Sequence, residues 1–131
     1  MRDSEEPPET VGDLMTVDLV ALLPTDRVER ARSVLLTLGI HALPVMEGNN
    51  VVGIVTSTDL IDEWSEDEVI TSVMTPTPTL IGVEATLQEA ADVMLAERTH
   101  HLMVTDDTEV IGIVSTFDLL EALSSPVASA G

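Results

Sequence analysis

The sequence Gly53-Ile54-Val55-Thr56-Ser57-Thr58-Asp59-Leu60 returns, at an offset of 59 residues, as Gly112-Ile113-Val114-Ser115-Thr116-Phe117-Asp118-Leu119. Between Val11 and Leu123 the two copies align without a gap. Two shorter motifs keep the same offset: Met15-Thr16 with Met74-Thr75, and His41-Ala42-Leu43-Pro44-Val45 with His100-His101-Leu102-Met103-Val104. Because internal repeats determine architecture, any site built by one copy is expected to have a counterpart in the other.

The repeat sets the domain organisation. A chain of 131 residues has the length of one domain, and each copy alone is of marginal size because small chains bury too little surface. We therefore expect the copies to share a core in one α/β module with a pseudo-two-fold axis. The predicted division is a flexible acidic tail at 1–10, repeats at 11–64 and 70–123, a linker at 65–69, and a flexible tail at 124–131.

Each copy reads as β-α-β-β-α. Val28, Ala31, Leu35 and Leu38 are spaced as one helix face; Asp26 would cap this helix, and Gly39 would end it. In the second copy, Thr86-Leu87-Gln88-Glu89 has the pattern of a capping box. The predicted strands are 17–23, 41–46, 51–56, 79–82, 100–105 and 110–115, and the predicted second helices of the copies are 59–64 and 118–123.

The charge is strongly acidic. Twenty-four Asp and Glu residues face five Arg and no Lys, for a net charge of −19. This charge argues against nucleic acid and anionic membranes as partners. It fits either an ordinary acidic protein or adaptation to a very salty cytoplasm, and the loss of all Lys favours the second, halophilic interpretation.

The rest of the composition narrows the class of protein. The absence of Cys excludes disulfides, thiolate nucleophiles and Cys-ligated metal sites. The N-terminus lacks the pattern of a signal peptide, and no apolar run approaches the roughly 20 residues that span a bilayer. These observations predict a cytoplasmic protein with no membrane association.

The motifs Thr56-x-x-Asp59 and Ser115-x-x-Asp118 each follow an apolar strand and open a predicted helix. One interpretation is a capping box, which satisfies backbone N–H groups at the helix start. The other is a ligand site, since a helix N-terminus with a hydroxyl can bind phosphate and an Asp one turn later can bind a ribose diol. Both roles can coexist at one helix start.

Taken together, these motifs resemble those of cystathionine β-synthase (CBS) domains, and two in tandem resemble a Bateman module. The resemblance covers residues 11–123 and rests on several separated motifs that recur in order, twice. It implies a non-catalytic regulatory module that binds adenosyl ligands such as AMP, ADP, ATP or S-adenosylmethionine, with no required cofactor. It also implies a homodimer and a protein target of unknown identity.

The resemblance assigns site residues. Thr56 and Ser115 would contact phosphate or its equivalent, and Asp59 and Asp118 would bind the ribose hydroxyls. The adenine would lie in an apolar slot, walled in the first copy by Thr16, Val17 and Asp18 with His41, Ala42, Leu43 and Pro44. In the second copy the walls would be Thr75, Pro76 and Thr77 with His101, Leu102 and Met103.

Some residues depart from the family pattern. Ala42 and His101 stand where many nucleotide-binding relatives carry Arg, Met103 replaces Pro44, and Arg98 is the only Arg in the second half of the chain. So acidic a protein favours a ligand of low negative charge, namely AMP, S-adenosylmethionine or methylthioadenosine, over ATP. The second site, with His101, is the better candidate for a phosphate.

Other classes of function have little support. The spacing of His41, His100 and His101 matches no recurrent zinc pattern, so no metal site is predicted. An enzyme would need an activated base, a metal set or a cofactor loop, and no such motif is present. The main alternative to a ligand sensor is a regulatory subunit that binds proteins and has vestigial pockets.

Overall fold

The computed structural model describes residues 8–17, 20–61 and 63–130. The chain forms two compact units: a central unit, Leu19–Pro78, and a terminal unit made of Met1–Asp18 together with Thr79–Gly131. These units do not coincide with the two sequence repeats. Each unit takes one short segment from the other repeat, as the strand pairing below shows.

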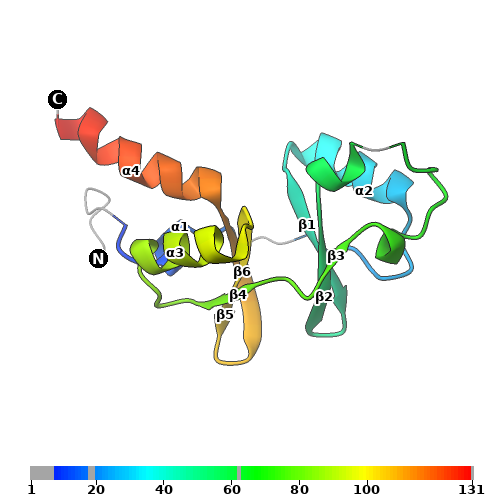
Figure 1. Cartoon of the computed structure of the whole chain (residues 1–131), viewed down its shortest axis with the longest axis horizontal. Coiled ribbons are helices and arrows are strands. Elements are labelled where there is room, and N and C mark those ends of the chain that lie inside the picture. The colour runs from blue at the N-terminus through cyan, green and yellow to red at the C-terminus, as the bar shows by residue number, and fades with distance from the viewer. Residues whose placement is uncertain (1–7, 18–19, 62, 131) are drawn as a thin grey trace. The chain divides into compact units, whose positions relative to one another are not determined.

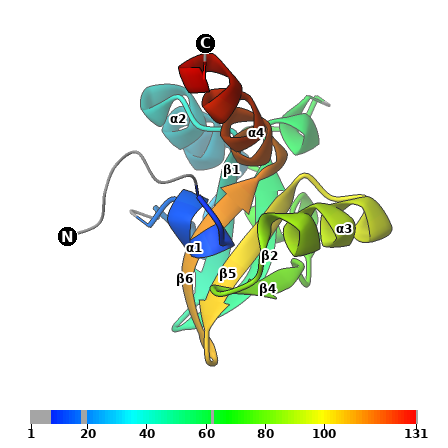
Figure 2. The ribbon, with the colours of Figure 1, turned by 90° about the vertical axis from the view of Figure 1, so that its left-hand side faces the viewer.

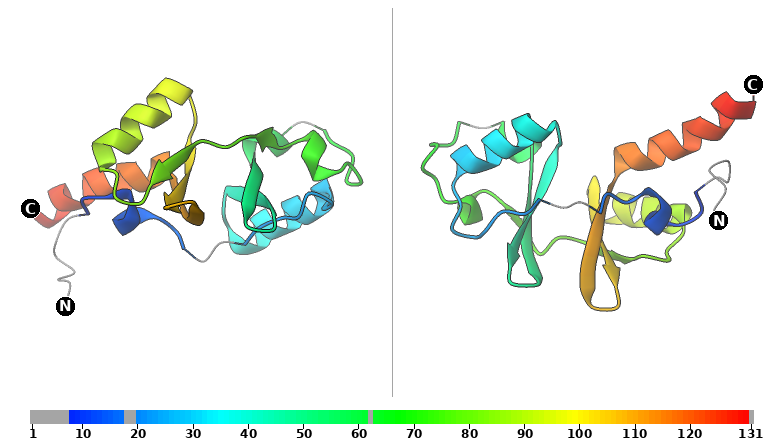
Figure 3. Two further views of the ribbon diagram at one scale, coloured as in Figure 1. Left: turned by 90° about the horizontal axis from the view of Figure 1, so that it is seen from below. Right: turned by 180° about the vertical axis from the view of Figure 1, so that it is seen from behind.

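The central unit has a three-stranded antiparallel sheet in the order β1-β2-β3. Helix α2 lies on one side of this sheet (Figures 1 and 3). The hydrophobic core of this unit contains residues of both repeats, since Ile70 and Val73 pack with Leu35, Val45 and Val55. Its elements are α2 (Val28–Leu38), β1 (Ala42–Glu47), β2 (Asn50–Thr56), the 3-10 helices η1 (Thr58–Leu60) and η2 (Ile70–Ser72), and β3 (Thr75–Pro76).

The terminal unit has a mixed sheet in the order β4-β5-β6, with β4 parallel to β5 and β5 antiparallel to β6. Helices α1, α3 and α4 lie on one side of this sheet (Figures 1 and 2). Val11 from the first repeat is fully buried in its core with Leu102, Val104 and Val114. The elements are α1 (Val11–Leu14), β4 (Leu80–Gly82), α3 (Leu87–Glu97), β5 (His101–Asp106), β6 (Glu109–Ser115) and α4 (Thr116–Ala130).

Each segment that joins the sheet of the other repeat packs a methionine side chain against a glycine of that sheet. Thr75 and Pro76 pair with Ile54 and Gly53 of β2, and a Cβ atom on Gly53 would lie 2.9 Å from Met74 Cγ. In the terminal unit Thr16 pairs with Ile113, and a Cβ on Gly112 would lie 2.6 Å from Met15 Sδ. The expectation of one shared core is therefore wrong: the described residues form two cores, each completed by a segment of the other repeat.

The hairpins and the long helices were predicted correctly, whereas the predicted strand 17–23 was not. It is reduced to one parallel bridge, Leu22 to Val45, the counterpart of Ile81 to Val104 in β4 and β5. Residues 18 and 19 lie outside the described part of the chain. A single bridge suffices there because Leu22 is fully buried, its N–H donates to Pro44 O and its carbonyl oxygen accepts from Met46 N.

The ends of two other elements differ from the prediction. In place of a helix over 59–64 the structure has only η1, and residue 62 lies outside the described residues. Helix α4 continues past its predicted end at Leu123 to Ala130, through the segment that we expected to be a flexible tail. The predicted tail at 1–10 is described only from residue 8, and Thr10 bridges Thr86.

One predicted cap is wrong and one is confirmed. The N-cap of α2 is Arg27, which makes no side-chain cap, while Asp26 Oδ2 accepts a hydrogen bond from Leu23 N at 2.7 Å. The equivalent position in the second repeat is Thr86, whose capping box with Glu89 is complete. Gly39 ends α2 in the left-handed conformation as predicted, with φ of 66°.

Candidate functional site

The two Thr/Ser-x-x-Asp motifs form reciprocal hydrogen-bonded boxes. Thr56 N donates to Asp59 Oδ2 at 2.9 Å, and Asp59 N donates to Thr56 Oγ1 at 3.2 Å. Ser115 N donates to Asp118 Oδ2 at 2.9 Å, and Asp118 N donates to Ser115 Oγ at 3.1 Å. The capping interpretation is thus confirmed at Ser115, directly before α4. At Thr56 the same reciprocal bonds close the turn before η1, whose N-cap is Ser57 without a side-chain cap. Within the described residues, Oδ1 of each Asp receives no hydrogen bond, so a ligand can still reach one oxygen.

The structure places two of the predicted wall segments of the adenine slots beside the opposite box from the one predicted. Thr75 and Pro76, assigned from the sequence to the second copy, pair with β2, the strand that ends at Thr56. Conversely, Thr16 pairs with Ile113 in β6, the strand that ends at Ser115. The assignment of these segments to their own copies was therefore wrong, because each one joins the sheet of the other repeat. Asp18, a predicted wall residue, lies outside the described residues.

The regrouped sets are as follows. The central unit brings together Thr56, Asp59, His41, Ala42, Pro44, Thr75, Pro76 and Thr77. The terminal unit brings together Ser115, Asp118, His101, Met103, Thr16 and Val17.

The strand register places Ala42 and His101, the two residues that depart from the expected Arg, opposite the hydroxyl residues of the boxes. Ala42 pairs with Thr56 across β1 and β2, and His101 pairs with Ser115 across β5 and β6. Directly opposed residues of antiparallel strands lie on the same face with Cβ atoms about 5 Å apart. Only the terminal unit therefore carries an imidazole beside the predicted phosphate hydroxyl.

Burial differs among the predicted wall residues. Pro44 and Met103 are fully buried at equivalent positions, whereas Thr75, Pro76 and Thr16 are exposed. Thr77 adopts a positive φ of 54°, and its N–H donates to Val52 O at 3.5 Å. The exposed edge segments could contact a ligand without rearrangement, while Pro44 and Met103 could do so only after local opening.

The histidines do not gather. His41 Nδ1 lies 3.4 Å from Ser57 Oγ, and His41 O accepts from Ser57 N at 2.9 Å. His100 O likewise accepts from Thr116 N at 2.9 Å. Over the described ranges, no three His, Asp or Glu side chains are placed to hold a metal ion.

Two described arginines of the central unit, Arg27 and Arg32, make contacts outside the boxes. Arg32 Nη1 lies 2.7 Å from Glu66 Oε1, and Arg32 Nη2 donates to Leu60 O at 3.1 Å. Arg27 donates to Asp67 O, and Arg98 ends α3 in the left-handed conformation. Among the described residues, no arginine pairs with Asp59 or Asp118, so neither box has a fixed cation for a polyphosphate.

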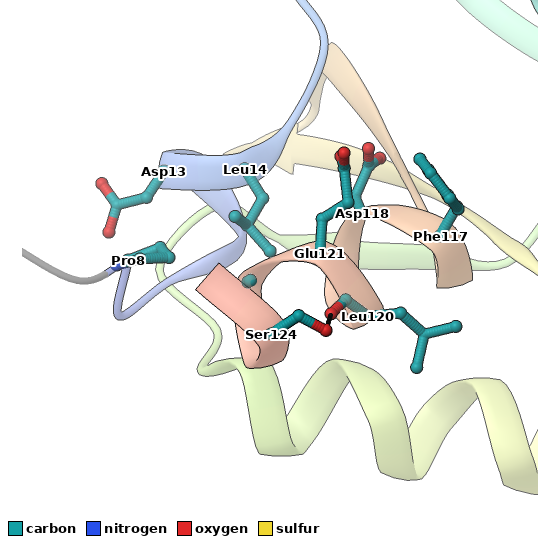
Figure 4. A pocket seen from close by; sticks show the side chains of 9 residues that line it. Pro8, Asp13, Leu14, Phe117, Asp118, Leu120, Glu121 and Ser124 are labelled. Carbon is teal, nitrogen blue, oxygen red and sulfur yellow. Dashed lines mark hydrogen bonds between the residues drawn. The ribbon is translucent and has the colours of Figure 1, made fainter. Parts of the chain in front are cut away.

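A cavity that the sequence did not predict opens between α1 and α4 of the terminal unit. Its volume is about 660 Å³, and Figure 4 shows Leu14 directed from α1 toward α4 beside Asp118 and Glu121. Asp118 is the one predicted site residue among its described lining. The lining residues are Pro8, Asp13, Leu14, Phe117, Asp118, Leu120, Glu121, Ala122 and Ser124.

This cavity could have been suspected from one sequence signal. Phe117, Leu120 and Leu123 recur every three residues, which is the spacing of one helix face. That signal lies almost wholly within the predicted helix 118–123 and does not indicate which segment faces it, whereas the cavity also needs Leu14 of the first repeat.

Comparison with known sequences identifies the family. The sequence model of the CBS domain matches residues 11–66 and 70–125. The chain belongs to the CBS-domain family. It carries two CBS domains in tandem, and the two matched ranges follow the sequence repeats, while the compact units exchange segments between them.

The relatives are of two kinds. The chain is 34% identical over 113 residues to inosine-5'-monophosphate dehydrogenase of Korarchaeum cryptofilum, and the match covers 86% of the chain but 24% of that protein. It is also 30% identical over 116 residues to the uncharacterized protein YlbB of Bacillus subtilis, and this match covers 83% of the chain and 78% of YlbB. The chain thus spans about a quarter of the dehydrogenase.

A solved CBS-pair structure has the same fold. The structure of CBSX2 in complex with AMP matches with a TM-score of 0.78 at 26% identity, covering 90% of this chain and 98% of that one. CBSX2 is a CBS-pair protein of Arabidopsis thaliana. The fold is therefore that of a CBS pair, a mixed α/β arrangement with two repeats. None of the described helices has the length and apolar character of a membrane span.

Proposed function

We propose that the chain is a regulatory module that binds an adenosyl ligand of low negative charge, such as AMP, S-adenosylmethionine or methylthioadenosine, at the two Thr/Ser-x-x-Asp boxes. The supporting observation is the paired geometry of the boxes. Each holds its Asp by Oδ2 through a backbone N–H and leaves Oδ1 without a donor among the described residues. A carboxylate fixed in this way can accept hydrogen bonds from a ribose diol.

The low charge of the ligand follows from the surroundings of the boxes. The chain carries 24 Asp and Glu, and the described arginines near the central unit's box are occupied by Glu66, Leu60 O and Asp67 O. A triphosphate would add several negative charges without a fixed partner. One phosphate beside His101 and Ser115 is compatible with the terminal unit, and a neutral or cationic group suits Ala42 and Thr56 better.

The match to CBSX2 gives this proposal an independent basis, because that protein was solved with AMP. Ligand binding regulates a partner only if it favours one of two conformations. By likeness to the family, we further propose that the module works as a homodimer acting on a separate protein target. Its excess of acidic residues over Arg supports a working environment of high salt.

Thermal unfolding in molar KCl tests the proposal. A ligand at a hundredfold excess over its Kd stabilises the folded state by about 2.7 kcal/mol, so Tm should rise with AMP, S-adenosylmethionine or methylthioadenosine and less with ATP. Asp59→Asn and Asp118→Asn should each reduce the rise. Glu89→Gln is the matched control, since it alters the capping box of α3 away from both sites.

The outcomes separate the two functional classes. No shift with any adenosyl compound would contradict the sensor and favour a protein-binding subunit with vestigial pockets. A shift that survives both Asp variants would place the ligand elsewhere.

A further inference from the structure

We propose that Arg32 and Trp64 are positioning residues for the Thr56–Asp59 box of the central unit. Neither side chain is part of the box itself. Each donates a hydrogen bond to a backbone carbonyl at the end of η1, the short helix that carries Asp59. The inference deepens the proposed adenosyl function and rests on it.

Two carbonyl oxygens at the end of η1 receive these donors. Trp64 Nε1 donates to Asp59 O at 3.0 Å, and Arg32 Nη2 donates to Leu60 O at 3.1 Å. Both bonds are partly buried, so a carbonyl that loses its donor is not fully hydrated in exchange. Asp59 is therefore held on both sides, because Thr56 bonds its carboxylate and its N–H while Trp64 bonds its carbonyl.

The other repeat shows why such donors are needed only at η1. Helix α4 is 15 residues long, whereas η1 has three residues. In a continuing α-helix each carbonyl accepts from the N–H four residues later, so the corresponding carbonyls of α4 need no side chain. At the repeat offset, Ala91 stands in place of Arg32 and Leu123 in place of Trp64. Neither of these side chains can donate a hydrogen bond.

The linker between the repeats sets the direction of Arg32. Its Nη1 lies 2.7 Å from Glu66 Oε1 while its Nη2 donates to η1, and a planar guanidinium bonded through two nitrogens is held in one orientation. The linker itself is fastened to the start of α2 by backbone hydrogen bonds, including one from Val28 N to Glu68 O at 2.9 Å. Loss of the Arg32 side chain should therefore leave the linker in place and release the end of η1.

The contacts bear on the ligand through the direction of one carboxylate. Asp59 Oδ2 is bonded to Thr56 N, and Oδ1 is the oxygen that we propose for the ribose diol. If the end of η1 is released, the backbone of Asp59 moves and its carboxylate samples other directions. A ligand must then order that carboxylate on binding, which lowers its affinity.

The first measurement needs no ligand. Amide hydrogen exchange, followed by NMR on the full chain in molar KCl, reports how often the N–H of Asp59 opens from Thr56 Oγ1. Arg32→Gln and Trp64→Phe should each speed this exchange by about tenfold. The equivalent N–H of Asp118 should keep its rate. Trp64→Phe removes the donor but retains an aromatic ring against the core.

The second measurement is calorimetric binding of methylthioadenosine in molar KCl. The parent chain carries Asp118→Asn, so that only the central box binds. In this parent, Arg32→Gln and Trp64→Phe should each weaken binding by about tenfold, which corresponds to about 1.4 kcal/mol. In a parent with Asp59→Asn, where only the terminal box remains, neither change should alter the affinity for AMP.

Arg30→Gln is the matched control. Arg30 also lies on α2, and its ion pair is with Asp26 at 3.8 Å. The substitution removes the same charge from the same helix, so it should change neither the exchange rate of Asp59 nor the affinity of the central box.

The outcomes separate this inference from the adenosyl proposal. If the Asp118→Asn parent binds methylthioadenosine and both Arg32→Gln and Trp64→Phe leave its affinity unchanged, the positioning role is overturned and the adenosyl site stands. Equal weakening by Arg30→Gln would also overturn it, since lost charge would then explain the effect. If the parent binds no adenosyl compound, the proposed function itself fails at this box, and the positioning role fails with it.

Discussion

Met74 packs against the backbone of Gly53 so closely that a Cβ atom on Gly53 would lie 2.9 Å from Met74 Cγ and 3.0 Å from Thr75 O. Gly112 stands in the same relationship to Met15 and Thr16 O. A methionine side chain can shift, but the carbonyl oxygen belongs to the exchanged backbone and moves only with that segment. These contacts are therefore where the exchanged segments are fixed in their sheets.

The first prediction concerns these glycines. Gly53→Ala and Gly112→Ala should each lower the free energy of unfolding by about 1–3 kcal/mol, the usual cost of inserting a methyl group into a packed site. Gly82→Ala is the control, since nothing lies within 4 Å of the added Cβ, and it should stay within about 0.5 kcal/mol. Urea unfolding in molar KCl measures all three, and a Gly53 variant as stable as the Gly82 variant would contradict this packing.

The exchange of segments is also the part of the fold that the sequence could not predict. The hairpins, α2 and α3 follow from local patterns, such as the apolar spacing of Val28, Ala31 and Leu35. Met15-Thr16 and Met74-Thr75 are identical, however, and so are Gly53 and Gly112. Pairing within a repeat and pairing between repeats therefore bury the same side chains, and no local pattern distinguishes them.

The candidate site divides in the same way. The boxes were predictable because Thr56 and Asp59, like Ser115 and Asp118, are only three residues apart and need only a local turn. The segments beside each box depend on the exchange and were assigned to the wrong copies. The cavity between α1 and α4 depends on Leu14 lying near α4 across a long sequence separation, and no single repeat contains both segments.

The second prediction uses a difference between the copies at the helix ends. Gly39 ends α2 with φ of 66°, and Arg98 ends α3 at the equivalent position with φ of 55°. A non-glycine residue in the left-handed region costs about 1–2 kcal/mol. Replacing it by Gly removes this cost, but the greater freedom of Gly in the unfolded chain offsets part of the gain in stability. Arg98→Gly should therefore stabilise the chain by about 0.5–1 kcal/mol. Gly39→Ala should destabilise it by about 1 kcal/mol.

Arg98→Ala separates conformation from charge. It removes the same cation but keeps a Cβ atom, so it should not reproduce the stabilisation. If Arg98→Ala and Arg98→Gly raise Tm equally, the effect comes from charge and not from the backbone.

The third prediction concerns Trp64, the only tryptophan of the chain. Its Nε1 donates to Asp59 O at 3.0 Å, and its ring packs against the core of the central unit. S-adenosylmethionine or methylthioadenosine bound at the Thr56–Asp59 box should therefore change tryptophan emission, measured by titration in molar KCl. Asp59→Asn should abolish the change and Asp118→Asn should leave it intact, whereas equal loss in both variants would show that the two boxes do not bind independently.

The last prediction tests the acidic surface at one pair of residues. Asp106 and Glu109 are direct partners across the β5–β6 hairpin, while the equivalent pair in the first repeat is Glu47 and Asn50. Like charges directly opposite one another destabilise a sheet by a few tenths of a kcal/mol. Glu109→Asn, which copies the first repeat, should therefore raise stability by about 0.5 kcal/mol in dilute KCl, as measured by thermal unfolding. The gain should vanish in molar KCl, where screening acts within about 3 Å.

Glu47→Gln is the matched control because its partner is neutral, so its effect in dilute salt should be smaller. An equal gain from both variants would mean that the net charge of the whole chain, and not the Asp106–Glu109 pair, sets the response to salt.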